Sequence, residues 1–144
     1  MLASISRWGT RVEPALGEPE PATRQVHILV VEDELFIRMF VSDALRDQGY
    51  TVIEAINADE AVDILMAGKS IDVVFSDVRM PGSIDGLGLL GVMKSLFPHV
   101  PVILASGHLG SQEALAKGAS HILSKPYQID AVLECIAKEL ASTV

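Results

Sequence analysis

Short apolar runs rich in β-branched residues alternate with amphipathic segments along most of this 144-residue chain, and this alternation constrains the fold more than any other feature. The runs occupy residues 26–31, 51–56, 71–75, 101–105 and 119–123. Several of them are apolar throughout, which is typical of strands buried on both faces of a parallel sheet.

The segments between the runs carry apolar residues at helical spacing. In the first of them, Ile37, Val41 and Leu45 lie on one face at four-residue steps. We expect helices between Asp33 and Gly49, between Asn57 and Gly68, over residues 86–97 and 109–117, and from about Gln128 onward. Five successive β-α units predict an α/β fold with a doubly wound, five-stranded parallel sheet, five helices and right-handed crossovers.

Residues 1–25 differ in composition from the rest of the chain. Pro14, Pro19 and Pro21 alternate there with three glutamates, so the segment has little apolar surface to bury. We interpret it as a flexible N-terminal extension, and residues 26–144 as one folded domain.

Composition excludes several classes of protein. The chain carries 19 acidic and 11 basic residues, a net charge of −8, so we expect no DNA binding. A single cysteine, Cys135, excludes an intramolecular disulfide and a cysteine-based zinc site. No apolar run approaches the roughly 18 residues of a membrane span, and residues 1–14 lack the apolar core of a secretory signal. We therefore expect a cytoplasmic protein with no membrane contact.

Polar residues follow four of the five predicted strands. Glu32 and Asp33 come after the first strand, Asp77 after the third, Ser106 after the fourth and Lys125 after the fifth. Each has a structural alternative, since carboxylates cap helices, serine forms turns and most lysines are solvated. Because the carboxyl ends of parallel strands meet at one edge of a sheet, we expect these five side chains to converge there.

Phosphoryl transfer to a carboxylate is the chemistry that requires this set. Crowded carboxylates repel one another, and a hard cation such as Mg²⁺ relieves the repulsion through oxygen ligands. One carboxylate then acts as a nucleophile and forms an acyl phosphate. The hydroxyl and the ammonium bind the transferred phosphoryl oxygens.

Five motifs give this chain a resemblance to the receiver domain of two-component response regulators. They are LVVEDE (29–34), VVFSDVRMPG (73–82), DGL (85–87), ILASG (103–107) and LSKPY (123–127), and together they span about residues 26–142. The resemblance implies a flavodoxin-like strand order of 2-1-3-4-5. It also implies that the domain is a signalling protein and no enzyme.

The resemblance implies a role for each matched residue. Asp77 resembles the phosphoacceptor, assisted by Ser106 and Lys125. The metal ligands would be Glu32, Asp33, Asp77 and the backbone carbonyl of Arg79, with Mg²⁺ as the cofactor. The Lys125–Pro126 bond is expected to be cis. The phosphodonor would be a histidine kinase or a histidine phosphotransferase.

Two features depart from the common pattern of the family. Ile122 stands three residues before Lys125, where many receivers carry an aromatic switch residue. The segment PGSIDG has one residue more between Pro81 and Asp85 than usual, so we expect an unusual loop beside Asp77.

Three functions remain in competition at this point. The first is a stand-alone phosphorylated receiver that contacts a protein effector, since the sequence ends at Val144, just after the last expected helix. The second is a receiver-like adaptor that is not phosphorylated. The third is a metal-dependent phosphohydrolase, although the sequence after the first strand lacks the Asp-x-Asp motif of such enzymes.

Overall fold

The computed structural model describes residues 24–107 and 111–142, and the predicted α/β architecture is confirmed within them. One sheet of parallel strands has the order β2-β1-β3-β4-β5, as expected. The strands are β1 (His27–Val31), β2 (Thr51–Ala55), β3 (Val73–Asp77), β4 (Val102–Ser106) and β5 (His121–Ser124). The helices are α1 (Leu35–Asp47), α2 (Ala58–Met66), α3 (Gly86–Leu96), α4 (Ser111–Ala116) and α5 (Ile129–Ser142).

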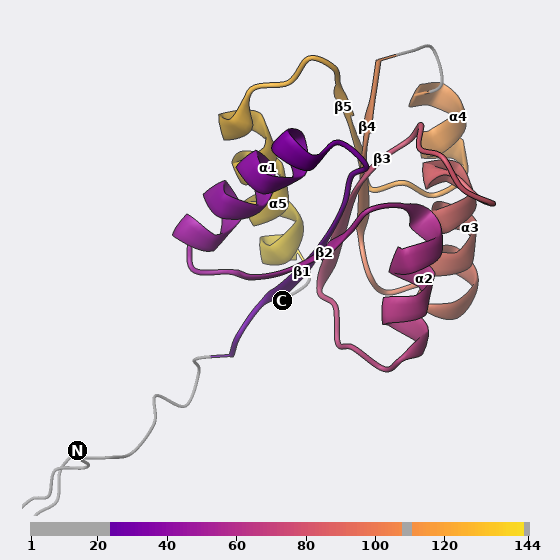
Figure 1. The fold of residues 1–144 in the computed structure, drawn as a ribbon, viewed down its shortest axis with the longest axis horizontal. Helices are drawn as coiled ribbons and strands as arrows, with labels where there is room; N and C mark the ends of the chain where they lie inside the picture. The colour runs from indigo at the N-terminus through magenta and orange to yellow at the C-terminus, as the bar shows by residue number, and fades with distance from the viewer. Residues whose placement is uncertain (1–23, 108–110, 143–144) are drawn as a thin grey trace, which may run out of the picture.

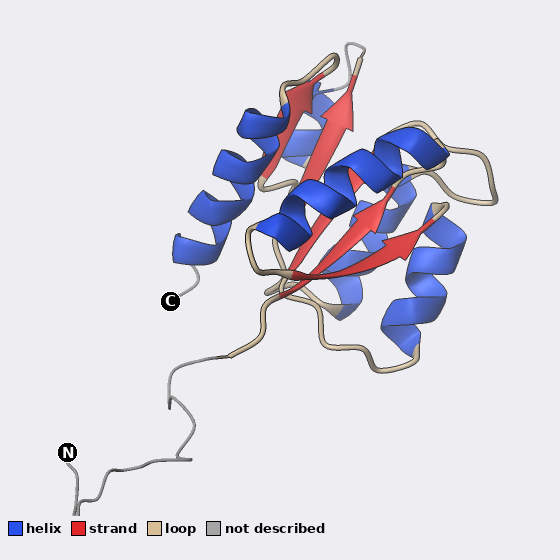
Figure 2. Cartoon of the chain, turned by 60° about the vertical axis from the view of Figure 1, so that its left-hand side comes forward, coloured by secondary structure: helices blue, strands red, loops and turns tan. Residues whose placement is uncertain are grey.

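The helices form two layers on opposite faces of the sheet (Figures 1 and 2). Helices α1 and α5 cover one face, whereas α2, α3 and α4 cover the other. None of the helices in the described ranges is both long and apolar enough to cross a membrane.

The strands at the centre of the sheet are buried on both sides, which explains their continuous apolar sequences. In β1, Leu29 and Val31 belong to the core under α2, α3 and α4, whereas Ile28 and Val30 belong to the core under α1 and α5. All four side chains are at most 1% exposed. The apolar run is therefore required by two separate cores that share one strand.

Reciprocal capping sets the boundary between β2 and α2. The predicted cap Asn57 accepts a hydrogen bond from the Glu60 N–H at 2.8 Å, and the Glu60 carboxylate accepts from the Ile56 N–H at 2.8 Å. Ile56 is thus part of the helix cap, and β2 ends one residue earlier than the sequence pattern predicts.

Asp72 sets the start of β3, two residues later than predicted. Its carboxylate accepts a hydrogen bond from the His27 N–H at 2.8 Å and pairs with Arg24 at 3.0 Å.

The first 23 residues of the expected extension lie outside the described residues, and so do residues 109 and 110 of the expected fourth helix. Strand β5 begins at His121, two residues later than predicted.

Gly86 lets α3 begin directly against the end of β3. Its N–H donates to the Val78 carbonyl at 2.8 Å. A Cβ built on Gly86 would overlap the Asp77 carbonyl oxygen and lie 2.7 Å from the Val78 Cα. Because both neighbours are backbone atoms, they cannot rotate away, so a side chain here must push α3 off the strand.

We expect Gly86→Ala to lower the free energy of unfolding by about 2 kcal/mol, because the added methyl group overpacks a backbone contact. The matched control is Gly91→Ala on the same helix, where an added Cβ meets nothing within 4 Å. That change should raise the free energy of unfolding by about 0.5–1 kcal/mol, the gain in helix propensity. Urea denaturation measures both, and equal effects of the two substitutions would contradict the packing argument.

Candidate functional site

The register of the sheet brings the predicted site residues to one edge. Val31 on β1 pairs with Ser76 on β3, so the next residues, Glu32 and Asp77, are neighbours. Asp77 in turn pairs with Ala105 on β4, one residue before Ser106. Parallel pairing therefore places residues 32, 77 and 106 side by side, although they are far apart in the sequence.

Three carboxylates form a compact cluster at this edge. Oxygen atoms of Glu32, Asp33 and Asp77 lie within 4.8 Å of one another. Glu32 is 5% exposed and Asp77 is 7% exposed, whereas Asp33 lies at the surface. Two carboxylates of the cluster are thus buried and one is accessible, and all three offer oxygen atoms, the ligand type that Mg²⁺ prefers.

Lys125 provides the positive charge of the site. Its Nζ atom lies 2.8 Å from Asp77 Oδ2. Partial burial disfavours the ammonium, but the hydrogen bond and the charges of Asp77, Glu32 and Asp33 outweigh this effect and raise the pKa of Lys125. The peptide bond that follows, Lys125–Pro126, is cis, as predicted.

The surroundings of Glu32 favour the neutral, protonated form of its carboxyl group. Burial raises its pKa to about 7, and the negative charge of Asp77 acts in the same direction. The Glu34 N–H, which donates to Glu32 Oε2 at 3.0 Å, opposes this shift. Without a cation, the cluster therefore holds a proton on Glu32 through mildly acidic pH.

A small pocket opens beside Asp77. Its volume is about 120 Å³, and it is lined by Asp77, Val78, Arg79, Ser106, Gly107 and Lys125. Two of the predicted residues, Ser106 and Arg79, thus border the pocket next to the carboxylate cluster. The predicted metal contact of the Arg79 backbone carbonyl stays a prediction.

The loop between β3 and α3 is tied to α2 through Asp59. The Asp59 carboxylate accepts hydrogen bonds from the N–H of Ser83, at 2.8 Å, and from the Ser83 hydroxyl. These bonds lower the pKa of Asp59. Gly82 precedes the contact with a φ of +124°, where a Cβ would lie 2.5 Å from Asp59 Oδ2. These bonds hold the loop that contains the segment PGSIDG, and the sequence contains no signal that pairs Asp59 with Ser83.

Ile122 occupies the position discussed for the switch residue. It is half-buried and packs against the core under α2, α3 and α4. The adjacent His121 is exposed, as expected for the next residue along a strand.

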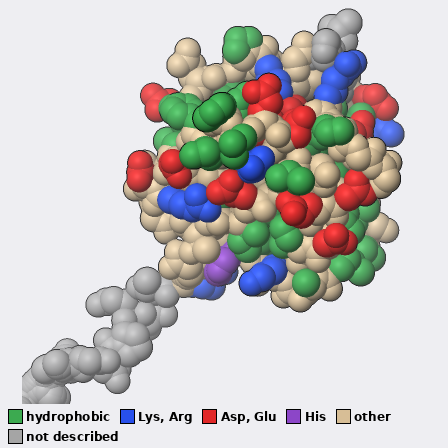
Figure 3. All heavy atoms as spheres, viewed as in Figure 1, with side chains coloured by type: hydrophobic (Ala, Val, Ile, Leu, Met, Phe, Trp, Pro, Cys, Tyr) green, Lys and Arg blue, Asp and Glu red, His purple; other side chains and the backbone are tan. Residues whose placement is uncertain are grey.

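An apolar groove lies next to the site. Its volume is about 570 Å³, and it is lined by Phe36, Ile37, Phe40, Val41, Lys125, Pro126 and Tyr127. Phe36 is 79% exposed and Phe40 is 60% exposed. Figure 3 shows hydrophobic side chains gathered over α1 on this side of the molecule. The four-residue spacing of the two phenylalanines was a signal for this surface that the sequence analysis did not use.

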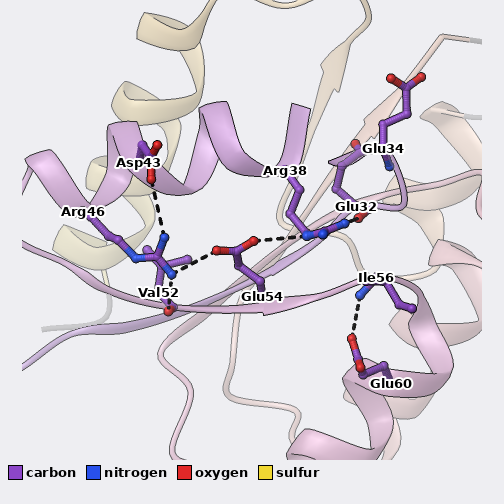
Figure 4. Close-up of polar contacts among 9 residues, drawn as sticks. All are labelled: Glu32, Glu34, Arg38, Asp43, Arg46, Val52, Glu54, Ile56 and Glu60. Atoms are coloured by element: carbon purple, nitrogen blue, oxygen red, sulfur yellow. Dashed lines mark hydrogen bonds and ion pairs between the residues drawn. The ribbon is translucent and has the colours of Figure 1, made fainter. Parts of the chain in front are cut away.

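An ion-pair network links α1 to β2 behind the cluster (Figure 4). Glu54 on β2 pairs with Arg38 at 3.1 Å and with Arg46 at 3.1 Å. Arg38 also donates to the Glu32 carbonyl at 2.9 Å. The sequence analysis did not single out these residues, because charged groups on an amphipathic helix ordinarily face solvent.

Known proteins share this architecture. The receiver domain of NtrX from Brucella abortus superposes with a TM-score of 0.73 at 33% identity, over 79% of this chain and 98% of that one. The receiver domain of the Francisella response regulator 1452 gives a TM-score of 0.77 at 25% identity, over 83% of this chain and 100% of that one.

Curated relatives are longer proteins. The response regulator protein FleR from Pseudomonas aeruginosa is 35% identical over 77% of this chain and 24% of its own length. The DNA-binding transcriptional regulator NtrC from Escherichia coli K12 is 35% identical over 79% of this chain and 24% of its own length. This chain thus spans about a quarter of each. Residues 28–137 match the model of the response regulator receiver domain, and the chain therefore belongs to this family of two-component signalling proteins.

Proposed function

We propose that this receiver domain accepts a phosphoryl group on Asp77 from a histidine kinase or a histidine phosphotransferase, in the presence of Mg²⁺. The observation that carries the proposal is the position of Asp77. Its carboxylate belongs to the acidic cluster, contacts Lys125 at 2.8 Å and lines the 120 Å³ pocket. No other carboxylate of the described chain lines that pocket.

Glu32, Asp33 and Asp77 fit a magnesium ion because they supply three oxygen ligands within 4.8 Å. The Arg79 carbonyl would add a fourth protein ligand and water the remainder. When bound, the cation neutralises charge on the carboxylates and on an incoming phosphoryl group. The raised pKa of Glu32 supports this assignment, since it reports charge repulsion and burial that a cation would relieve.

The chain's own residues would divide the transfer between them. A carboxylate oxygen of Asp77 attacks phosphorus, and the bond from phosphorus to the donor's histidine nitrogen breaks, leaving its electron pair on that nitrogen. Lys125 uses one N–H on Asp77, and its other N–H groups would be available to the added phosphoryl oxygens. Ser106 lines the same pocket, and its hydroxyl would donate to the same oxygens.

The apolar groove supports a protein phosphodonor. It shares Lys125 with the phosphoryl pocket, so a partner seated on Phe36 and Phe40 would also cover Asp77 and exclude water from the transfer. Exposed aromatic side chains in such a position are typical of binding surfaces.

Output would pass from Ser106 to a protein effector and not to DNA. The net charge of −8 opposes contact with nucleic acid by this domain. Ile122 is smaller than an aromatic residue and stiff about χ1, so a ring swing is not available to it. The displacement would then fall on Gly107, the residue after Ser106, and on α4.

We expect Asp77→Asn to abolish base-labile labelling by a small phosphodonor such as acetyl phosphate in Mg²⁺, because the amide is not a nucleophile. Glu34→Gln, at an exposed acid beside the cluster, is the control and should label like wild type. Phosphate incorporation measures labelling, and circular dichroism shows whether each variant is folded. Full labelling of a folded Asp77→Asn protein would assign the acceptor elsewhere. If the wild-type protein is not labelled, the result favours a receiver-like adaptor that is not phosphorylated. If it releases phosphate continuously over many turnovers, the result favours a metal-dependent phosphohydrolase.

We expect Mg²⁺ to stabilise the wild-type protein, by about 2.7 kcal/mol at a concentration one hundred times its Kd. Asp33→Ala should lose this effect because it removes the accessible ligand. Asp47→Asn, at an exposed aspartate on α1, should keep it. Thermal unfolding with and without Mg²⁺ measures the shift. Equal stabilisation of Asp33→Ala and wild type would exclude Asp33 from the site.

We expect the cation-free protein to lose stability as pH rises from about 4.5 to about 7. Glu32 is protonated in the folded state over this window and ionised in the unfolded state, so raising the pH favours unfolding. In Glu32→Gln this part of the pH dependence should vanish, and Mg²⁺ should suppress it in wild type. Urea denaturation at a series of pH values tests both, and parallel curves for wild type and Glu32→Gln would show that Glu32 titrates normally.

A further inference from the structure

Arg38 reaches from α1 to the backbone of the acidic loop. Its NH1 group donates to the Glu32 carbonyl at 2.9 Å, and its Nε donates to Glu54 Oε1 at 3.1 Å. The side chain is 13% exposed, which is low for an arginine on a surface helix. Figure 4 shows the guanidinium between Glu32, just after β1, and Glu54, near the end of β2.

The bond to the Glu32 carbonyl fixes the peptide that leads into Asp33. The Glu32 N–H already donates to the Ala55 carbonyl at 3.0 Å, so this residue is held on both sides of its Cα. The carbonyl of Glu32 and the nitrogen of Asp33 lie in one rigid plane. Arg38 therefore restricts the direction in which Asp33 leaves the strand.

Other constraints on this loop are weak or use the ligands themselves. Glu34 caps α1 without any side-chain hydrogen bond. The Glu34 N–H is held by Glu32 Oε2, a carboxylate oxygen that a cation would also attract. Arg38 leaves the oxygens of Glu32, Asp33 and Asp77 untouched, because its two bonds go to a backbone carbonyl and to Glu54.

Arg46 offers a matched comparison within the same network. It pairs with the other oxygen of Glu54 at 3.1 Å and donates to a backbone carbonyl, that of Val52, at 3.1 Å. Val52 lies inside β2 and not in the acidic loop. Arg46 thus makes the same kinds of bond as Arg38, and to the same Glu54, but it does not contact the acidic loop.

We propose that Arg38, held by Glu54, is a positioning residue for the cation site and presets the Glu32–Asp33 loop for Mg²⁺. This inference rests on the proposed function of the Glu32, Asp33 and Asp77 cluster. Loss of the guanidinium would let the loop sample more orientations, so ion binding would carry an additional ordering cost. Groups that orient metal ligands in this way are typically worth tenfold or more in metal affinity.

The test is the Kd for Mg²⁺, measured by isothermal titration calorimetry on the full chain. Arg38→Met should weaken binding about tenfold, whereas Arg46→Met should stay within about twofold of wild type. Both variants lose an ion pair to Glu54, so a merely structural role would lower both melting temperatures and leave both Kd values alike. An unchanged Kd in folded Arg38→Met would overturn the proposal.

Two further variants keep the test decisive if Arg38→Met folds poorly. Glu54→Gln retains the shape of the anchor but removes its charge, so it should weaken Mg²⁺ binding less than Arg38→Met does. Arg38→Lys keeps the charge but lacks the fork that bonds two groups at once, so it should restore affinity only in part. If Glu54→Gln and Arg38→Lys both bind Mg²⁺ with wild-type affinity, the proposal is also overturned. If wild type itself binds no Mg²⁺, the cation site fails; if it binds and Arg38→Met binds equally, only the role of Arg38 fails.

Discussion

Three carboxylates lie crowded together at the carboxyl edge of the sheet, and the structure around them either holds them there or offsets their mutual repulsion. Parallel pairing of β1 with β3 forces Glu32 against Asp77, and the chain adds Asp33 within 4.8 Å. One ammonium, that of Lys125, lies directly on this cluster, at 2.8 Å from Asp77. Three carboxylates against one cation leave an excess of negative charge, which the folded chain tolerates through the raised pKa of Glu32. This uncompensated negative charge makes the cluster suited to binding a cation.

Rigid surroundings keep these charges together. The β1 residues that lead to the cluster are buried in two cores, one on each face of the sheet. Polar contacts then hold the loops from outside: Arg38 bonds the Glu32 carbonyl, and Asp59 bonds Ser83 beyond β3. In both cases the contact reaches a loop without using a carboxylate of the cluster. The carboxylate oxygens of the cluster stay available, and packing and backbone hydrogen bonds offset the repulsion between them.

The sequence predicts those parts of this molecule that follow from periodicity and chain order. The strand order was implied by the family resemblance, and the convergence of Glu32, Asp33, Asp77, Ser106 and Lys125 follows from their places at or just after the carboxyl ends of the strands. The ties through Arg38 and Asp59 were not predictable, because each joins residues 16 or 24 positions apart whose pairing depends on loop shape. The end of β2 and the start of β3 were shifted by one and two residues where the side chains of Glu60 and Asp72 took a backbone partner.

The separation of the two cores by the sheet has a consequence for divergence within the family. The groove on α1 belongs to one layer, whereas Ile122 packs into the other. Substitutions at distant positions without shared partners change stability additively. A substitution at Phe36 or Phe40 and one at Ile122 should therefore change the free energy of unfolding independently. Under the proposed function, the surface that would receive the phosphodonor and the surface around α4 would then be free to change at different rates.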